Sequence, residues 1–149
     1  MKIKIFALTH KKFEVPQDKM YQPLQVGREG KEDLGYLCDN TGDNISAENC
    51  YYSELTGLYW IWKNVHAYKY VGTCHYRRYL LNEQEKIFTE TEYLELLKDY
   101  DLITTKRVVL NNSYHYGFAT NHNIHALDMT GEVIKELYPE YYDTFVQLV

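Results

Sequence analysis

The sequence predicts an α/β fold with a mostly parallel sheet and helices on both faces, and three patterns predict it. Residues 2–9 first alternate and then stay apolar, which is typical of a strand that becomes fully buried. A helical pattern at 53–64 precedes a strand pattern at 68–74, and a second helical pattern at 89–100 precedes a short apolar stretch at 101–105. Strands that alternate with helices build parallel sheets covered on both sides, and residues 1–149 fit a single domain.

The segment between the first strand and the first helix is predicted to be mostly irregular. Residues 10–21 contain Pro16 and several charges and are expected to form a loop, followed by a short strand at 22–26. Residues 27–49 hold four glycines and the polar run 39–44, so we expect a long loop there. Long loops without regular structure are uncommon and are often functional.

The helices are predicted from start signals and apolar spacing. Ser53 is the expected N-cap of the helix at 53–64, whose buried stripe would consist of Leu55, Leu58, Tyr59 and Trp62. Thr89 and Glu92 form a capping box at the start of the helix at 89–100. Residues 106–121 are expected to be a mobile loop, 122–138 a helix weakened by Gly131, and Pro139 the first residue of a last helix.

Charge and composition restrict the kinds of partner. The net charge of −5 argues against nucleic-acid binding, yet two basic clusters, His10-Lys11-Lys12 and Arg77-Arg78, each follow a predicted strand, which suggests one local anion site. The sixteen tyrosines fit either ordinary packing or stacking on sugars. Three cysteines without CxxC spacing are predicted to be free buried thiols. The sequence contains no signal peptide and no apolar run of about 18 residues, so we expect a cytoplasmic protein. Peripheral association with the inner face of the membrane is left open.

The segment CHYRRY carries the clearest chemistry. In parallel sheets, ligands bind outside the carboxyl ends of strands, which is where this segment falls. If residues 75–79 stay extended, His75, Arg77 and Tyr79 share one face, and Tyr76 and Arg78 the other. A guanidinium fork suits phosphate because it donates two hydrogen bonds at once. The alternative is a pair of surface arginines in structural ion pairs.

The helix and strand around this motif resemble those of sugar-transfer enzymes with the type-A nucleotide-diphospho-sugar fold. In several such families a helix with an acidic residue precedes a strand that ends in Asp-x-Asp, which holds a divalent metal. Here SELTGLYWIWKN and YVGTCHYRRYL stand in those places, and His75-Tyr76-Arg77-Arg78 replaces the acidic pair. Fixed positive charge could then do the work of the metal. No cofactor or metal ligand is therefore assigned, although Mn²⁺ or Mg²⁺ stays open.

The whole chain resembles one domain-of-unknown-function family from bacterial capsular polysaccharide, exopolysaccharide and lipopolysaccharide loci. The segments KIKIFALTHKKFEVP, GDNISAENCYYSELTGLYWIWKN, YVGTCHYRRYL, YDLITTK and ELYPEYYDTF come in the order typical of that family. Its members are described as glycosyltransferases, some as galactofuranosyltransferases. Family members extend further at the C-terminus, so we expect a C-terminal part, with much of the acceptor site, to be missing here.

The resemblance implies a set of site residues in this chain. We expect the catalytic residues to be Arg77, His75 and Asp43, and the donor to be bound by Thr9, His10, Lys11, Asn44, Glu54, Tyr76 and Arg78. The alternatives are a solvated loop at 9–11 and an Asx turn at 43–44. For Glu54, an ion pair that braces an arginine such as Arg77 is favoured over contact with the donor, because a buried carboxylate needs a partner. The general base is left open among Asp39, Asp43 and a residue beyond Val149.

The function implied is transfer of a sugar from a nucleotide-diphospho-sugar, with UDP-sugar favoured, to a glycan or lipid-linked acceptor. The alternative is a non-catalytic remnant that binds a glycan or a protein partner. A metal-dependent phosphoryl-transfer or hydrolytic enzyme is the least supported, because the sequence has no P-loop and no carboxylate cluster. His122 and His125 share a helical face but lack an acidic third ligand for zinc.

Overall fold

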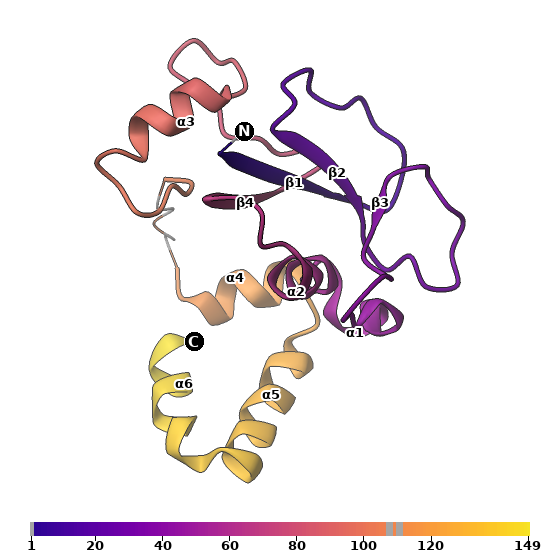
Figure 1. Ribbon diagram of the computed structural model, residues 1–149. Helices are drawn as coiled ribbons and strands as arrows, with labels where there is room; N and C mark the ends of the chain where they lie inside the picture. The colour runs from indigo at the N-terminus through magenta and orange to yellow at the C-terminus, as the bar shows by residue number, and fades with distance from the viewer. Residues whose placement is uncertain (1, 107–108, 110–111) are drawn as a thin grey trace. The chain divides into compact units, whose positions relative to one another are not determined.

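The computed structural model describes residues 2–106, 109 and 112–149. The chain forms two compact units, Met1–Thr105 and Lys106–Val149. Figure 1 shows the helices and strands of both units. The candidate site lies entirely within the first unit.

The first unit is built on a four-stranded sheet in which every pair of neighbouring strands is parallel. Its strands are β1 (Ile3–Thr9), β2 (Tyr21–Gln25), β3 (Leu37–Cys38) and β4 (Tyr70–His75), in the order β3-β2-β1-β4. All seven residues of the central strand β1 are buried. The three strands predicted at 2–9, 22–26 and 68–74 are confirmed, whereas the two-residue strand β3 was predicted as loop.

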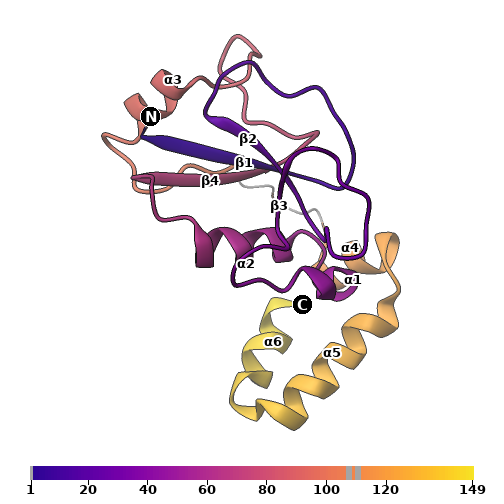
Figure 2. The ribbon, with the colours of Figure 1, turned by 45° about the vertical axis from the view of Figure 1, so that its right-hand side comes forward.

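Helices cover both faces of this sheet, as the sequence predicts. On one face, α2 (Leu55–Asn64) follows the short elements η1 (Ser46–Glu48) and α1 (Asn49–Tyr52), and it packs in a core made of Phe6, Leu8, Leu24, Val26, Trp60 and Ile61. On the other face, α3 (Glu90–Leu96) adds Tyr93 to a core with Ile3, Ile5, Met20 and Tyr21. Figure 2 shows α2 and α3 on opposite sides of the strands. The predicted capping box between Thr89 and Glu92 is present.

The buried side of α2 differs from the predicted one. The predicted stripe is wrong, because Leu55, Leu58 and Trp62 are exposed and the buried residues are Thr56, Gly57, Trp60 and Ile61. Gly57 explains the difference. A Cβ there would lie 2.5 Å from Val26 Cγ1 and 3.0 Å from Leu8 Cδ2, so the missing side chain lets the helix approach the sheet closely.

The start of α2 was also predicted incorrectly. Ser53 has a φ of 50° and ends α1, and Glu54 occupies the N-cap position of α2 without a capping hydrogen bond from its side chain. The carboxylate of Glu54 is therefore left free for other contacts. This turn between two helices sets the position of Glu54 in the candidate site.

Residues 101–105 form no strand in the structure, contrary to the prediction. They line a cavity together with β4 instead. Within the described part of the chain, β4 is paired on one side by β1 and has no strand on its other side. Among these residues the sheet therefore ends at β4, and the edge of β4 that faces away from β1 is free of other strands.

The second unit contains α4 (Tyr114–Asn121), α5 (Ile124–Leu137), η2 (Pro139–Tyr141) and α6 (Tyr142–Leu148). Helix α4 lies in the segment predicted as a loop, of which residues 107–108 and 110–111 fall outside the described residues. Gly131 serves a packing purpose, since a Cβ there would lie 2.9 Å from Phe145 Cε1. None of the helices described has the length and apolar character needed to cross a membrane.

The three cysteines are free thiols. Cys38 and Cys74 are partly buried, and burial raises the pKa of Cys74 to about 12. Cys50 is exposed, contrary to the prediction that all three are buried.

Candidate functional site

The ends of β1 and β4 lie side by side and carry the basic residues singled out in the sequence. Leu8 of β1 is aligned with His75 of β4, and the Tyr76 backbone N–H donates to Leu8 O at 3.1 Å. Beyond that point the chain turns, because Arg78 N donates to His75 O at 2.8 Å. Residues 75–79 are therefore not extended, and the predicted alternation of faces does not hold.

The ring of Tyr76 is the centre of this strand end. Tyr76 is 6% exposed, and its ring is edge-on to the imidazole of His10 at a centroid distance of 5.6 Å. Lys11 Nζ lies 5.7 Å from the ring centroid and Arg77 Cζ 5.1 Å from it, both at cation–π distance. Basic side chains from the ends of two neighbouring strands thus lie around one buried ring.

The cations around Tyr76 are exposed and available to a ligand. Lys11, Arg77 and Arg78 are exposed side chains, and among the described residues none of them lies within ion-pair distance of a carboxylate. The alternative of structural arginine ion pairs therefore finds no support here. Cations gathered at the carboxyl ends of parallel strands are suited to bind an anion such as a diphosphate.

Thr9 stabilises the turn that carries two of these basic side chains. It is 1% exposed, and its hydroxyl accepts from Lys11 N at 3.1 Å and donates to Lys11 O at 2.5 Å. These two bonds fix the turn that carries His10 and Lys11. The structure thus gives Thr9 a positioning role and does not present its hydroxyl to a ligand.

Glu54 and His75 form a carboxylate–imidazole pair next to the cations. His75 Nε2 lies 3.3 Å from Glu54 Oε1, and His75 Nδ1 accepts from Arg77 N at 3.2 Å. Since Nδ1 acts as an acceptor, we assign the imidazole proton to Nε2, which donates it to Glu54. Burial lowers the pKa of His75, and the positive charge of Arg77, Arg78 and His10 acts in the same direction against the raising effect of Glu54. The predicted brace between Glu54 and Arg77 is replaced by one between Glu54 and His75.

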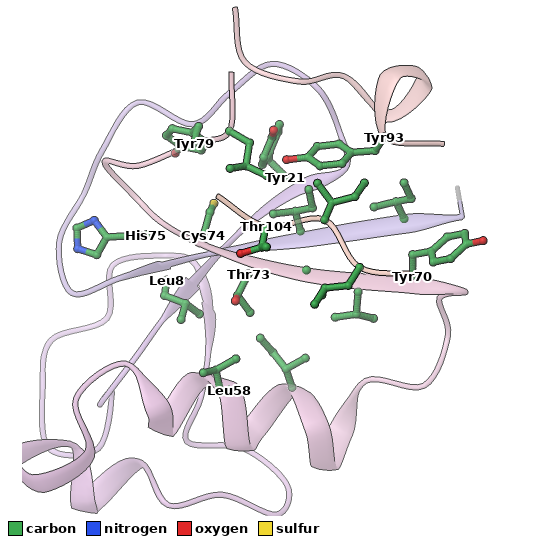
Figure 3. A pocket seen from close by; sticks show the side chains of 18 of the residues that line it. Leu8, Tyr21, Leu58, Tyr70, Thr73, Cys74, His75, Tyr79, Tyr93 and Thr104 are labelled. Atoms are coloured by element: carbon green, nitrogen blue, oxygen red, sulfur yellow. The ribbon is translucent and has the colours of Figure 1, made fainter. Parts of the chain in front are cut away.

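A cavity of about 970 Å³ runs along the free edge of β4. Its polar end is lined by Glu54, His75 and Arg78, and much of the remainder by apolar side chains that include Leu55, Leu58, Trp62, Val71 and Leu102. Figure 3 shows Leu58 and Thr73 on the α2 side of β4, and Tyr79 and Tyr93 on the opposite side. The sequence did not predict this cavity, because the exposed apolar residues of α2 had been assigned to the core.

Comparison with known proteins identifies the family. The family model of DUF4422, a domain of unknown function, matches residues 4–149. The chain belongs to the DUF4422 family. Among solved structures, it is similar to the apo structure of the WbbM bifunctional glycosyltransferase, with a TM-score of 0.75 and 25% sequence identity over 99% of this chain. The chain spans 31% of the length of that protein chain. A comparison with curated proteins gave no match.

Two further predicted residues of this DUF4422 chain lie elsewhere. Asp43 accepts from Tyr59 Oη at 3.0 Å and lies 3.8 Å from Lys63 Nζ, so it contacts the second half of α2, whereas Glu54 precedes the first turn of that helix. Asn44 Oδ1 accepts from Ser46 N at 3.1 Å, which is the Asx turn considered as the alternative. The structure does not bring either residue to the cations around Tyr76.

Asp39, one of the residues left open as a general base, is fully buried. Its carboxylate accepts from Gly27 N, Arg28 N, Ser46 Oγ and Thr56 Oγ1 at distances between 2.6 and 3.0 Å. A carboxylate with four donors and no exposure holds the fold together and cannot reach an acceptor. The four donors are spread over residues 27–56, so no local sequence pattern predicts this cluster.

The DUF4422 site does not resemble a divalent-metal site. Within the described ranges, no group of three or more His, Cys, Asp or Glu side chains is placed to hold a metal ion. At the strand end, the carboxylate of Glu54 is paired with the imidazole of His75, while Mg²⁺ and Mn²⁺ prefer several oxygen ligands.

Proposed function

We propose that this DUF4422 chain binds a nucleotide-diphospho-sugar and transfers its sugar to a hydroxyl group of a glycan or lipid-linked acceptor in the synthesis of bacterial surface polysaccharides. The observation that carries this proposal is the group of exposed cations around Tyr76, at the adjoining ends of β1 and β4. The likeness to a glycosyltransferase structure supports the same reaction class.

The cations suit the leaving group of this reaction. When the bond between the sugar C1 and the diphosphate oxygen breaks, negative charge grows on the diphosphate. Arg77 can donate two hydrogen bonds to phosphate oxygens, and Lys11 adds a point charge from the other strand. Because the buried ring of Tyr76 and the turn at Thr9 hold both side chains beforehand, little reorganisation is needed when the charge forms.

Isothermal titration calorimetry with UDP, UDP-glucose and UDP-galactose tests the donor site, with and without Mn²⁺. Removal of one charge-assisted hydrogen-bonding partner costs about 1.5–3 kcal/mol, so Arg77→Ala and Lys11→Ala should each weaken UDP binding roughly 10–100-fold. Lys86→Ala removes an exposed lysine from the turn before α3 and serves as the matched control. Absence of heat with all three nucleotides, or equal affinity in wild type and Arg77→Ala, would contradict the proposed donor site.

A second candidate function is glycan binding without catalysis. It is favoured by Trp62, which is 67% exposed and lines the cavity beside Leu58. Exposed tryptophan rings offer a flat apolar surface to sugar rings. Binding to a glycan array together with a failure to consume any UDP-sugar would favour this function over transfer.

A further inference from the structure

We propose that Glu54, held in place by His75, is the general base that removes the proton from the acceptor hydroxyl. This inference rests on the proposed transferase function and names a group that the sequence left unassigned. It is carried by the geometry of the Glu54–His75 pair and by its place between the cations and the cavity.

His75 itself is not free to act as the base. Its Nδ1 accepts from the Arg77 backbone N–H, and its Nε2 is directed to Glu54 Oε1, so both ring nitrogens are engaged. The charged and titratable groups that face the ring are Glu54 from the N-cap of α2, His10 from the end of β1, and Arg77 and Arg78 from its own turn. Burial is the main cause of the lowered pKa of His75, and three of these four groups act in the same direction, which favours a neutral hydrogen-bond donor.

Glu54, by contrast, has one carboxylate oxygen that can accept a proton. Its side chain is 50% exposed, and no hydrogen bond from the described residues reaches its second carboxylate oxygen. A carboxylate that is fixed through one oxygen and open at the other meets the geometric requirement for a general base. The role of His75 is then to position Glu54, since it contacts the carboxylate and not the acceptor.

The position of Glu54 suits an acceptor that enters through the cavity. Glu54 lines the polar end of the cavity, while its partner His75 is next to Tyr76 and Arg77 in the chain. An acceptor whose apolar part lies along the apolar lining of the cavity would therefore present a hydroxyl to Glu54 at the polar end. The diphosphate would lie on the cations beyond His75.

The step is a single displacement in which atoms and charge balance. The acceptor O–H bond breaks and its proton passes to the free oxygen of Glu54. The acceptor oxygen forms a bond to the sugar C1 as the bond between C1 and the diphosphate oxygen breaks. The electron pair of that bond leaves with the nucleoside diphosphate, whose charge is stabilised by Arg77 and Lys11.

The first experiment measures UDP release from UDP-galactose and UDP-glucose, with octyl galactoside, octyl glucoside or water as acceptor. Because general-base catalysis contributes about 10²–10⁴-fold, Glu54→Gln should lower turnover by at least about 100-fold. Its affinity for UDP should stay within about twofold of wild type, because the cations are untouched. Glu83→Gln alters an exposed carboxylate in the turn before α3 and should leave both quantities unchanged.

The second experiment separates a base from a merely structural residue. Azide attacks C1 without losing a proton, so azide should restore turnover of Glu54→Ala and yield a glycosyl azide detectable by mass spectrometry. His75→Ala should lower turnover about tenfold or more, and by a larger factor than it weakens UDP binding, since His75 also accepts from the Arg77 backbone N–H. His75→Gln, whose amide can donate to Glu54, should recover part of the turnover.

The outcomes distinguish this inference from the proposed function. If the wild type binds no UDP, the proposed function fails, and the inference fails with it. If UDP binds but Glu54→Gln turns over at the wild-type rate, or azide gives no rescue, the inference alone is overturned. A wild type that binds UDP-sugar and releases no UDP to any acceptor or water would overturn the transferase function, and the inference with it.

Discussion

Replacing Asp39 should lower the free energy of unfolding of the first unit more than replacing any other charged side chain named above. Its buried carboxylate joins the loop after β2, through Gly27 and Arg28, to η1 through Ser46 and to α2 through Thr56. These four contacts tie residues 27–56 into one structure. Asp39→Ala removes all four acceptor contacts and leaves four donors to find other partners.

The size of the effect follows from the number of donors. Each buried donor left without an acceptor costs about 1–3 kcal/mol, and water entry and relaxation recover part of the total. We therefore expect Asp39→Ala to lower the free energy of unfolding by about 3–5 kcal/mol. For a unit of about a hundred residues, 1 kcal/mol corresponds to roughly 4 °C, so the Tm should fall by roughly 12–20 °C. Asp39→Asn keeps one oxygen and should lie between this variant and wild type.

Tryptophan fluorescence during thermal and urea unfolding measures this effect, because Trp60 and Trp62 both lie in the first unit and Trp60 is buried. Asp99→Asn, an exposed position after α3, is the control and should leave the Tm unchanged within about 1 °C. The reasoning would be refuted if the Tm of Asp39→Ala lay within about 2 °C of wild type with an unchanged urea dependence.

Two other predictions concern α2 and the strand end. Gly57→Ala should destabilise the first unit by about 1–3 kcal/mol because its new methyl group meets Val26. Gly117→Ala, in α4 with no heavy atom within 4 Å of the added Cβ, should be neutral or stabilise its own unit by up to about 1 kcal/mol. Circular dichroism during urea unfolding measures both, and a change in unfolding free energy of the same sign in both variants would contradict the packing argument. His75 has a pKa below its ordinary value of 6.5, so the unfolded chain takes up this proton first, and stability should decline as the pH falls below about 6.5. Urea midpoints between about pH 7 and about pH 5.5 should show a smaller decline in His75→Gln than in wild type, and an identical decline in both would exclude His75 as the cause.

The strands could be predicted from the sequence because burial on both faces leaves a continuous apolar signal. Residues 3–9 are all buried, and that run was plain to see. The buried face of α2 could not be predicted in the same way, because a periodicity argument weighs side chains and gives Gly57 no weight. Here the glycine decides which face meets the sheet, since its lack of a Cβ allows contact with Val26 and Leu8.

The basic half of the candidate site could also be predicted, because Lys11 and Arg77 follow apolar strands and parallel strands end at one edge. The acidic half could be predicted less well. Glu54 was expected to contact Arg77, but the tight turn after His75 places the imidazole against the carboxylate instead. Asp43 was expected at the site from its place before a helix, yet hydrogen bonding to Tyr59 holds it along that helix.

The presence of His75 between Glu54 and the arginines has a consequence for reactivity. A direct ion pair between Glu54 and Arg77 would occupy the guanidinium fork needed for a diphosphate and would lower the basicity of the carboxylate. The neutral imidazole fixes Glu54 through one oxygen and adds no positive charge, while its other nitrogen holds the backbone of Arg77. The two side chains are thus positioned by the same ring yet kept from neutralising one another, which is what a reaction with both a base and a stabilised anionic leaving group requires.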